Sequence, residues 1–177
     1  MSEHQPDPSI RGELDEPAPE PLRQQPSRNY TAAVYGSVLA ATVVLSSGDL
    51  RAPGVLALLL IVSGVVFWLA HVYAATVAAV HGGWQPGAIM AGLRHEWPVA
   101  FAAIPPAIAA VIGGSFPMVT ATEGAWAALI VAIVEQQAWG YAAVRNARLS
   151  GTVLARTMLL NLSIGLIIVV VKVGLAH

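Results

Sequence analysis

The sequence predicts an all-α integral membrane protein, a helical bundle of about five transmembrane helices preceded by a disordered N-terminal tail. Two observations predict this class. Only 11% of the 177 residues are charged and 56% are hydrophobic, whereas a soluble domain carries about 25% charged residues. In addition, five apolar stretches approach the roughly 20 residues that a helix needs to cross a hydrocarbon core of about 30 Å. We therefore expect a transmembrane helical domain over residues 30–177.

Residues 1–29 differ in composition from the rest of the chain. The first 28 residues hold six of the ten acidic residues and six of the twelve prolines. So polar a segment buries too little apolar surface to offset the entropy lost on ordering, and we predict a disordered, acidic, Pro-rich tail. The first apolar run begins only at Tyr30. A signal peptide would need a basic start followed directly by an apolar stretch, so none is expected.

The five apolar stretches have different characters. The first is short but free of charge, the second is rich in Leu, Ile and Val, and the third is interrupted by two adjacent prolines. The fourth contains three consecutive polar residues, and the fifth is rich in Ile and Val. The predicted spans are residues 30–47, 55–80, 98–116, 124–144 and 153–176.

The connection between the second and third spans is the longest, and its pattern is not that of a plain loop. After Pro86, four apolar residues recur at helical spacing. This predicts an interfacial helix over about 86–97 that leads into the third span. The alternative is a third helix that starts near Ala88 and is kinked at Pro98 and again at Pro105 and Pro106.

Basic residues in the connections predict the orientation, because Arg and Lys are retained on the cytoplasmic side. With the N-terminus inside, only Arg51 and Lys172 lie outside. Seven basic residues then lie on the cytoplasmic side: Arg11, Arg23, Arg28, Arg94, Arg145, Arg148 and Arg156. Eight of the nine basic residues are Arg in a chain dominated by Ala, Val and Gly, which we interpret as the product of a GC-rich bacterial genome. The expected location is the bacterial cytoplasmic (inner) membrane, with the N-terminus in the cytoplasm and, after five spans, the C-terminus outside.

One carboxylate falls near the middle of a predicted span. Glu135 lies about 10 residues into the fourth span, where a charged side chain costs about 3 kcal/mol on insertion scales. With Gln136 and Gln137 it covers about 200° of the helix surface, at 100° per residue, so no single contact with another helix takes up all three. Depth along the spans makes His71 and Asn161 the expected partners. The candidate intramembrane polar cluster is therefore His71, Glu135, Gln136 and Asn161.

This cluster has two interpretations. A pair formed by a histidine and a carboxylate can exchange a proton near neutral pH, which predicts transport or a proton relay. Alternatively, the polar groups are interhelical hydrogen bonds that hold the bundle, each worth about 0.6–2 kcal/mol.

Two further sequence features bear on helix packing. Pro105 and Pro106 must break or kink the third helix, and a broken helix exposes carbonyls that can coordinate ions where they line protein or water. The alternative is a static kink against Ala-rich neighbours. Ala32, Gly36 and Ala40 form a small-residue face on the first span, which permits close packing within the bundle or between subunits.

The sequence contains no signature of an enzyme. Nucleotide-binding, serine-hydrolase and zinc-protease motifs are absent, there is no cysteine, and no two histidines are spaced i, i+4. We therefore expect no catalytic activity, no cofactor and no metal site, and the net charge of −1 indicates no nucleic-acid partner. The sequence favours a small transporter or channel-like protein. The alternative is a non-catalytic membrane subunit or scaffold, with the lipid bilayer and a second copy or another membrane protein as partners.

Overall fold

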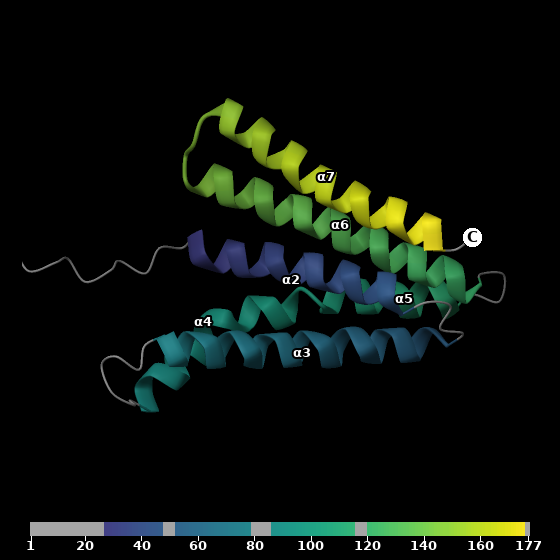
Figure 1. Cartoon of the computed structure of the whole chain (residues 1–177), viewed down its shortest axis with the longest axis horizontal. Helices are drawn as coiled ribbons and strands as arrows, with labels where there is room; N and C mark the ends of the chain where they lie inside the picture. Colours follow the sequence, from purple (N-terminus) through teal and green to yellow (C-terminus); the bar gives the residue numbers. More distant parts are fainter. Residues whose placement is uncertain (1–26, 48–51, 79–85, 116–119, 176–177) are drawn as a thin grey trace, which may run out of the picture.

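The computed structural model describes residues 27–47, 52–78, 86–115 and 120–175. Within these residues every regular element is an α-helix, and Figure 1 shows the helices lying side by side in an elongated bundle. The helices are α2 (Ser27–Ser46), α3 (Pro53–Ala78), α4 (Pro86–Phe101), α5 (Ile104–Ser115), α6 (Ala121–Asn146) and α7 (Gly151–Leu175). The predicted all-α class is confirmed. Most of the predicted tail lies outside the described residues, and its last three positions belong to α2.

Four stretches of this bundle are long and apolar enough to cross a membrane by length and composition, and they are Gly54–Ala78, Ile89–Ser115, Ala121–Asn146 and Gly151–Gly174. The apolar part of α2, Tyr30–Ser46, is shorter. Outside the third predicted span, the helix ends lie within three residues of the predicted span ends. Length and apolarity predict such helices well, because in a bilayer each backbone amide must find its partner inside its own segment.

The third predicted span differs most from the structure. α4 runs from Pro86 through Pro98 to Phe101, and α5 begins at Ile104. The boundary expected between an interfacial helix over 86–97 and the third span therefore falls inside α4. A helix that starts near residue 88 and continues past Pro98, which was the alternative interpretation, describes this region better.

Ala102 and Ala103 separate α4 from α5. The amide of Ala103 donates to the carbonyl of Ala100 at 3.2 Å, which is the tighter i to i+3 pattern of a 3₁₀ turn. Pro105 and Pro106 lie in the first turn of α5, where an amide hydrogen has no intrahelical partner to lose. The helix is therefore interrupted immediately before the proline pair.

The centre of the bundle is α2, which packs against α3, α4, α6 and α7. In Figure 1 it lies between α6 on one side and the α3 and α4 layer on the other. Its predicted small-residue face, Ala32, Gly36 and Ala40, is buried inside the bundle. A Cβ atom on Gly36 would lie 2.8 Å from the carbonyl oxygen of Val99 and 2.9 Å from the Cβ of Ala102. Glycine at this position allows the backbone of α2 to approach the end of α4.

α7 lies on the flank of the bundle, where it packs mainly on α6 and to a smaller extent on α2. Its outward side presents large apolar side chains that are more than half exposed: Leu159, Leu160, Leu162, Leu166, Ile167 and Val170. A face of this kind matches the hydrocarbon of a bilayer, as expected for a membrane-spanning helix.

Candidate functional site

Two amide side chains join α6 to α7 near the middle of both helices. Nε2 of Gln136 donates to the backbone carbonyl of Asn161 at 3.3 Å, and Nδ2 of Asn161 donates to the backbone carbonyl of Gln136 at 3.4 Å. Gln136 is fully buried and Asn161 is 8% exposed. The structure therefore brings together two of the four predicted cluster residues as a reciprocal pair.

Glycines let the two helices come this close. A Cβ atom added to Gly140 on α6 would collide with Nδ2 of Asn161, and it would lie 3.2 Å from the terminal methyl carbon of Met158. One turn further along α7, a Cβ on Gly165 would lie 2.9 Å from Cγ2 of Ile133. Gly140 thus provides the space in which the Asn161 side chain reaches the backbone of α6.

Glu135 lies at the middle of α6, about 2 Å from the centre of this 26-residue helix at 1.5 Å per residue. One carboxyl oxygen, Oε1, accepts a hydrogen bond from the indole Nε1 of Trp139 at 3.1 Å. The other oxygen, Oε2, is buried and has no hydrogen-bond partner in the structure. The carboxyl group is thus held by one tryptophan and keeps one oxygen available.

Two neighbouring residues of α6 also have buried polar atoms without a hydrogen-bond partner. These atoms are Oε1 of Gln136 and Nε2 of Gln137. A buried polar group that forms no hydrogen bond costs about 1–3 kcal/mol, and the penalty rises in an apolar medium. Together with Glu135 Oε2, these atoms form a polar girdle around the middle of α6, and we use this name for Glu135, Gln136 and Gln137.

His71 takes a different place in the bundle. It lies on α3, where its Nδ1 is 3.0 Å from the carbonyl oxygen of Phe67 one turn earlier. Its ring centroid is 5.0 Å from that of Tyr35 on α2. In the described part of the chain, no hydrogen bond or ion pair links His71 to the polar residues of α6 or α7. The predicted four-residue cluster is therefore divided, with His71 in the contact between α2 and α3.

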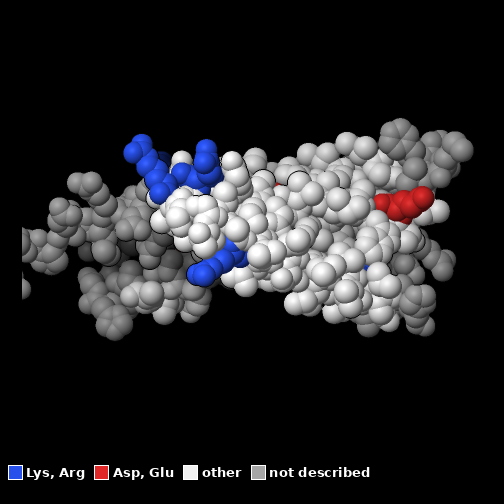
Figure 2. All heavy atoms as spheres, turned by 90° about the horizontal axis from the view of Figure 1, so that it is seen from above, with Lys and Arg blue, Asp and Glu red and all other residues white. Residues whose placement is uncertain are grey.

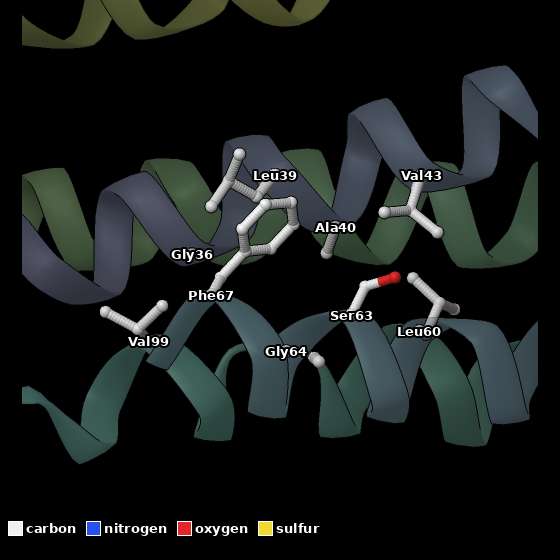
Figure 3. A pocket seen from close by; sticks show the side chains of 10 residues that line it. Gly36, Leu39, Ala40, Val43, Leu60, Ser63, Gly64, Phe67 and Val99 are labelled. Atoms are coloured by element: carbon white, nitrogen blue, oxygen red, sulfur yellow. The ribbon is translucent and has the colours of Figure 1, made fainter. Parts of the chain in front are cut away.

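The break between α4 and α5 lies against small residues of α2 and α3. A Cβ on Gly64 of α3 would lie 2.7 Å from the Cβ of Ala103, so glycine allows the break to pack closely against α3. A cavity of about 10 Å³ adjoins this contact, which is at the lower limit for one water molecule. Figure 3 shows that its walls are mainly apolar and come from α2, α3 and α4, with Phe67 between the helices and Ser63 as the hydroxyl-bearing residue. The break itself, at Ala102 and Ala103, is thus closely packed against α2 and α3.

A second hollow, of about 320 Å³, lies between α3 and α5. Its lining consists of Ala, Ile and Val side chains only: Ala57, Ile61, Ile104, Ala107, Ile108, Val111 and Ile112. A hollow without polar groups offers nothing to orient a polar substrate. Neither of these two hollows is lined by a residue of the polar girdle.

A chain of contacts that the sequence analysis did not predict leads from Glu135 to the end of α6. The Trp139 ring that holds Glu135 lies 6.1 Å from the ring of Tyr30 on α2, centroid to centroid. The Tyr30 hydroxyl in turn accepts a hydrogen bond from Nδ2 of Asn146 at 2.6 Å. The i, i+4 spacing of Glu135 and Trp139 was the available signal, because such residues share one helix face.

Lys172 also takes a role that the sequence did not indicate. A lysine near the end of a membrane-spanning helix usually extends toward the aqueous boundary. Instead its Nζ lies 3.5 Å from the carbonyl oxygen of Val44 on α2 and 5.7 Å from the ring centroid of Trp126 on α6. Lys172 therefore ties the end of α7 to both neighbouring helices.

Comparison of the chain with models of protein families, with curated proteins and with solved structures finds no match. In the described residues, no three His, Cys, Asp or Glu side chains come together as a group that could hold a metal ion. The features of the described residues that bear on function are therefore the bundle itself and the polar girdle of α6.

Proposed function

We propose that the protein is a small carrier or channel-like protein for protons or monovalent cations, with Glu135 as the group that binds the ion. The observation that carries this proposal is the position of its carboxyl group. It lies at the middle of a membrane-spanning helix, with Oε1 held by Trp139 and Oε2 buried without a partner. Ionisable residues at such depths are rare and are typical of ion pathways and proton relays.

The chemistry of the neighbouring residues supports this role. A carboxyl group fixed by one hydrogen bond can bind a proton or a cation at its second oxygen without losing its position. The free Oε1 of Gln136 and Nε2 of Gln137 supply further polar groups at nearly the same depth. If left without partners, the three atoms would together cost several kcal/mol, and the binding of a polar species would lower that penalty.

A specific observation favours a second candidate function, that of a non-catalytic membrane subunit or scaffold. The pair of Gln136 and Asn161 is a tightly packed contact between helices, as expected of polar residues that hold a bundle together. In this case the girdle contributes to the assembly of helices, with a second copy or another membrane protein as the partner, and no ion crosses.

Flux measurements on the purified protein distinguish the two functions. The full chain is reconstituted into liposomes and a sodium or potassium gradient is imposed. Proton movement is followed with a pH-sensitive dye and cation movement with a dye sensitive to sodium or potassium. We expect flux above that of protein-free liposomes and a fall to this background in Glu135→Gln. The matched control is Glu123→Gln on the same helix. Glu123 forms the capping box with Thr120, and Gln is also accepted at that position, so the control should retain full flux.

Either of two results overturns the ion-carrier proposal. The first is a wild-type protein that moves neither protons nor cations faster than empty liposomes. The second is a Glu135→Gln protein that is folded and retains wild-type flux. Circular dichroism and gel filtration of both variants establish that they are folded before flux is compared.

We also propose that the chain lies in the bacterial inner membrane with its N-terminus in the cytoplasm. Four arginines of the described residues support this orientation. Arg145, Arg148 and Arg156 flank the turn between α6 and α7, and Arg94 lies on α4, whose beginning is at the same end of the bundle (Figure 1). Short connections rich in arginine are retained in the cytoplasm.

A further inference from the structure

Basic side chains gather at one end of the face formed by α6 and α7. Figure 2 shows them around the turn between these helices, with an acidic side chain at the opposite end. The basic residues of this turn are Arg145, Arg148 and Arg156, all exposed. Within the described part of the chain, none of the three forms an ion pair with a carboxylate within 4.0 Å. Among the described residues, no carboxylate neutralises their positive charge, which suits the binding of an external anion.

The depth of these residues places them at the phosphate layer of a bilayer. Arg145 is about 17 Å along α6 from its middle, at 1.5 Å per residue, and half of a hydrocarbon core is about 15 Å. Arg148 lies just beyond the helix end. Arg156 is about 10 Å from the middle of α7, and its long side chain can extend to the boundary. All three guanidinium groups therefore reach the level of the lipid headgroups.

Arg148 has a backbone conformation that arginine rarely adopts. Its φ is 53°, in the left-handed region. Its amide donates to the carbonyl of Arg145 at 3.1 Å, and the amide of Leu149 donates to the carbonyl of Val144 at 3.2 Å. This is the Schellman pattern of a helix C-terminus, in which glycine is the usual residue at the position of Arg148. A residue kept in a strained conformation is a reason to look for a role of its side chain.

We propose that Arg145, Arg148 and Arg156 form a binding site for the phosphate of an anionic phospholipid. A guanidinium group pairs with phosphate through two parallel hydrogen bonds, and basic groups at the ends of spanning helices bind such headgroups. The guanidinium carbon of Arg145 lies 6.0 Å from the ring centroid of Tyr141, and an aromatic residue at the interface suits this depth. The site does not depend on ion transport by Glu135.

Lipid binding by variants of the full chain tests this site. The protein is purified in a neutral detergent, and native mass spectrometry compares its binding of phosphatidylglycerol and phosphatidylcholine. We expect a preference for phosphatidylglycerol. Arg148→Gly and Arg156→Gln should each weaken the binding of phosphatidylglycerol about fivefold. This is the contribution of about one basic residue at an anionic surface. The matched control is Arg94→Gln, which removes a charge from α4 on the other side of α2 and should leave the preference unchanged.

Arg148→Gly should also change the thermal stability of the protein, and in the opposite direction to its lipid affinity. Because glycine adopts a positive φ without strain, this variant should unfold at a midpoint about 2–4 °C above wild type in the neutral detergent. A variant that is more stable and yet binds phosphatidylglycerol less tightly cannot owe its weaker binding to misfolding.

Three results would overturn the site. One is equal binding of phosphatidylglycerol and phosphatidylcholine by the wild type. Another is a loss of phosphatidylglycerol affinity in Arg94→Gln as large as that in Arg148→Gly, because lipid binding would then depend only on the total charge of the protein. The third is displacement of phosphatidylglycerol by millimolar inorganic phosphate, which would indicate a site for free anions rather than lipid.

Discussion

Gln136 and Asn161 each donate a side-chain amide hydrogen bond to the backbone carbonyl of the other, across the contact between α6 and α7. Each carbonyl also belongs to a helix, so both bonds form only at one relative position of the two helices along their axes. The pair therefore determines the register of α7, a flanking helix with few other buried residues.

Removing this pair should weaken the bundle. We expect Asn161→Leu and Gln136→Leu each to lower the free energy of unfolding by about 1–2 kcal/mol, and the double variant to lose less than the sum, with a coupling of about 0.6–1.7 kcal/mol. Equilibrium unfolding in mixed micelles measures these values. Additive losses would show that the two side chains do not act on each other.

Gly140→Ala should separate α6 from α7. The new methyl group would collide with the Asn161 side chain, and overpacking of this kind costs about 1–3 kcal/mol. The control is Gly174→Ala, since a Cβ at Gly174 has nothing within 4 Å and alanine favours the helix. Thermal unfolding in detergent should show a lower midpoint for the first variant only. Equal midpoints would contradict the close approach at Gly140.

Lys172→Met should loosen the end of α7. Methionine keeps a long apolar chain like the methylene groups of lysine but lacks the ammonium group that contacts the Val44 carbonyl and the Trp126 ring. We expect a loss of about 1 kcal/mol, together with a shift of Trp126 fluorescence. Lys172→Arg keeps the positive charge and should stay near wild type. Unchanged stability in Lys172→Met would mean that the lysine contributes only through its carbon chain.

Reporter fusions test the orientation. If the N-terminus is cytoplasmic and the helices cross five times, with α4 and α5 as one span, a reporter after His177 lies outside. Alkaline phosphatase fused there should then be active and green fluorescent protein dark, and the reverse should hold for fusions within the connection between α6 and α7. An active cytoplasmic reporter at His177 would contradict five crossings.

The sequence predicted the helices well and their contacts less well. Long apolar stretches in a bilayer must be helical, so the limits of the helices, apart from the start of the third span, followed closely from hydropathy. The place of the helix break was harder to predict. Proline has no amide hydrogen, so Pro105 and Pro106 cannot donate to the carbonyls of Phe101 and Ala102, four residues earlier, and the interruption appears at Ala102 and Ala103 rather than at the prolines themselves.

The sequence could not predict which side of each helix faces which neighbour, and this determines the contacts at the candidate site. Gln136 and Asn161 were expected at similar depths, and they do meet. His71 was also placed by depth, but its contact with Tyr35 depends on which side of α3 faces α2. The hydrophobic pattern of α3 contains no such information, because nearly every position in the helix is apolar.

The position of α2 has a consequence for synthesis of the chain. Its main partner α6 begins 75 positions after α2 ends, counting from Ser46 to Ala121. At 5–20 residues per second, this takes roughly 4–15 seconds, during which the buried face of α2 contacts lipid or the insertion machinery. The buried hydroxyl of Ser37 donates to the carbonyl of Ala33 in its own helix at 2.8 Å. The hydroxyl of Ser37 therefore has a hydrogen-bond partner within α2 even before α6 is synthesised.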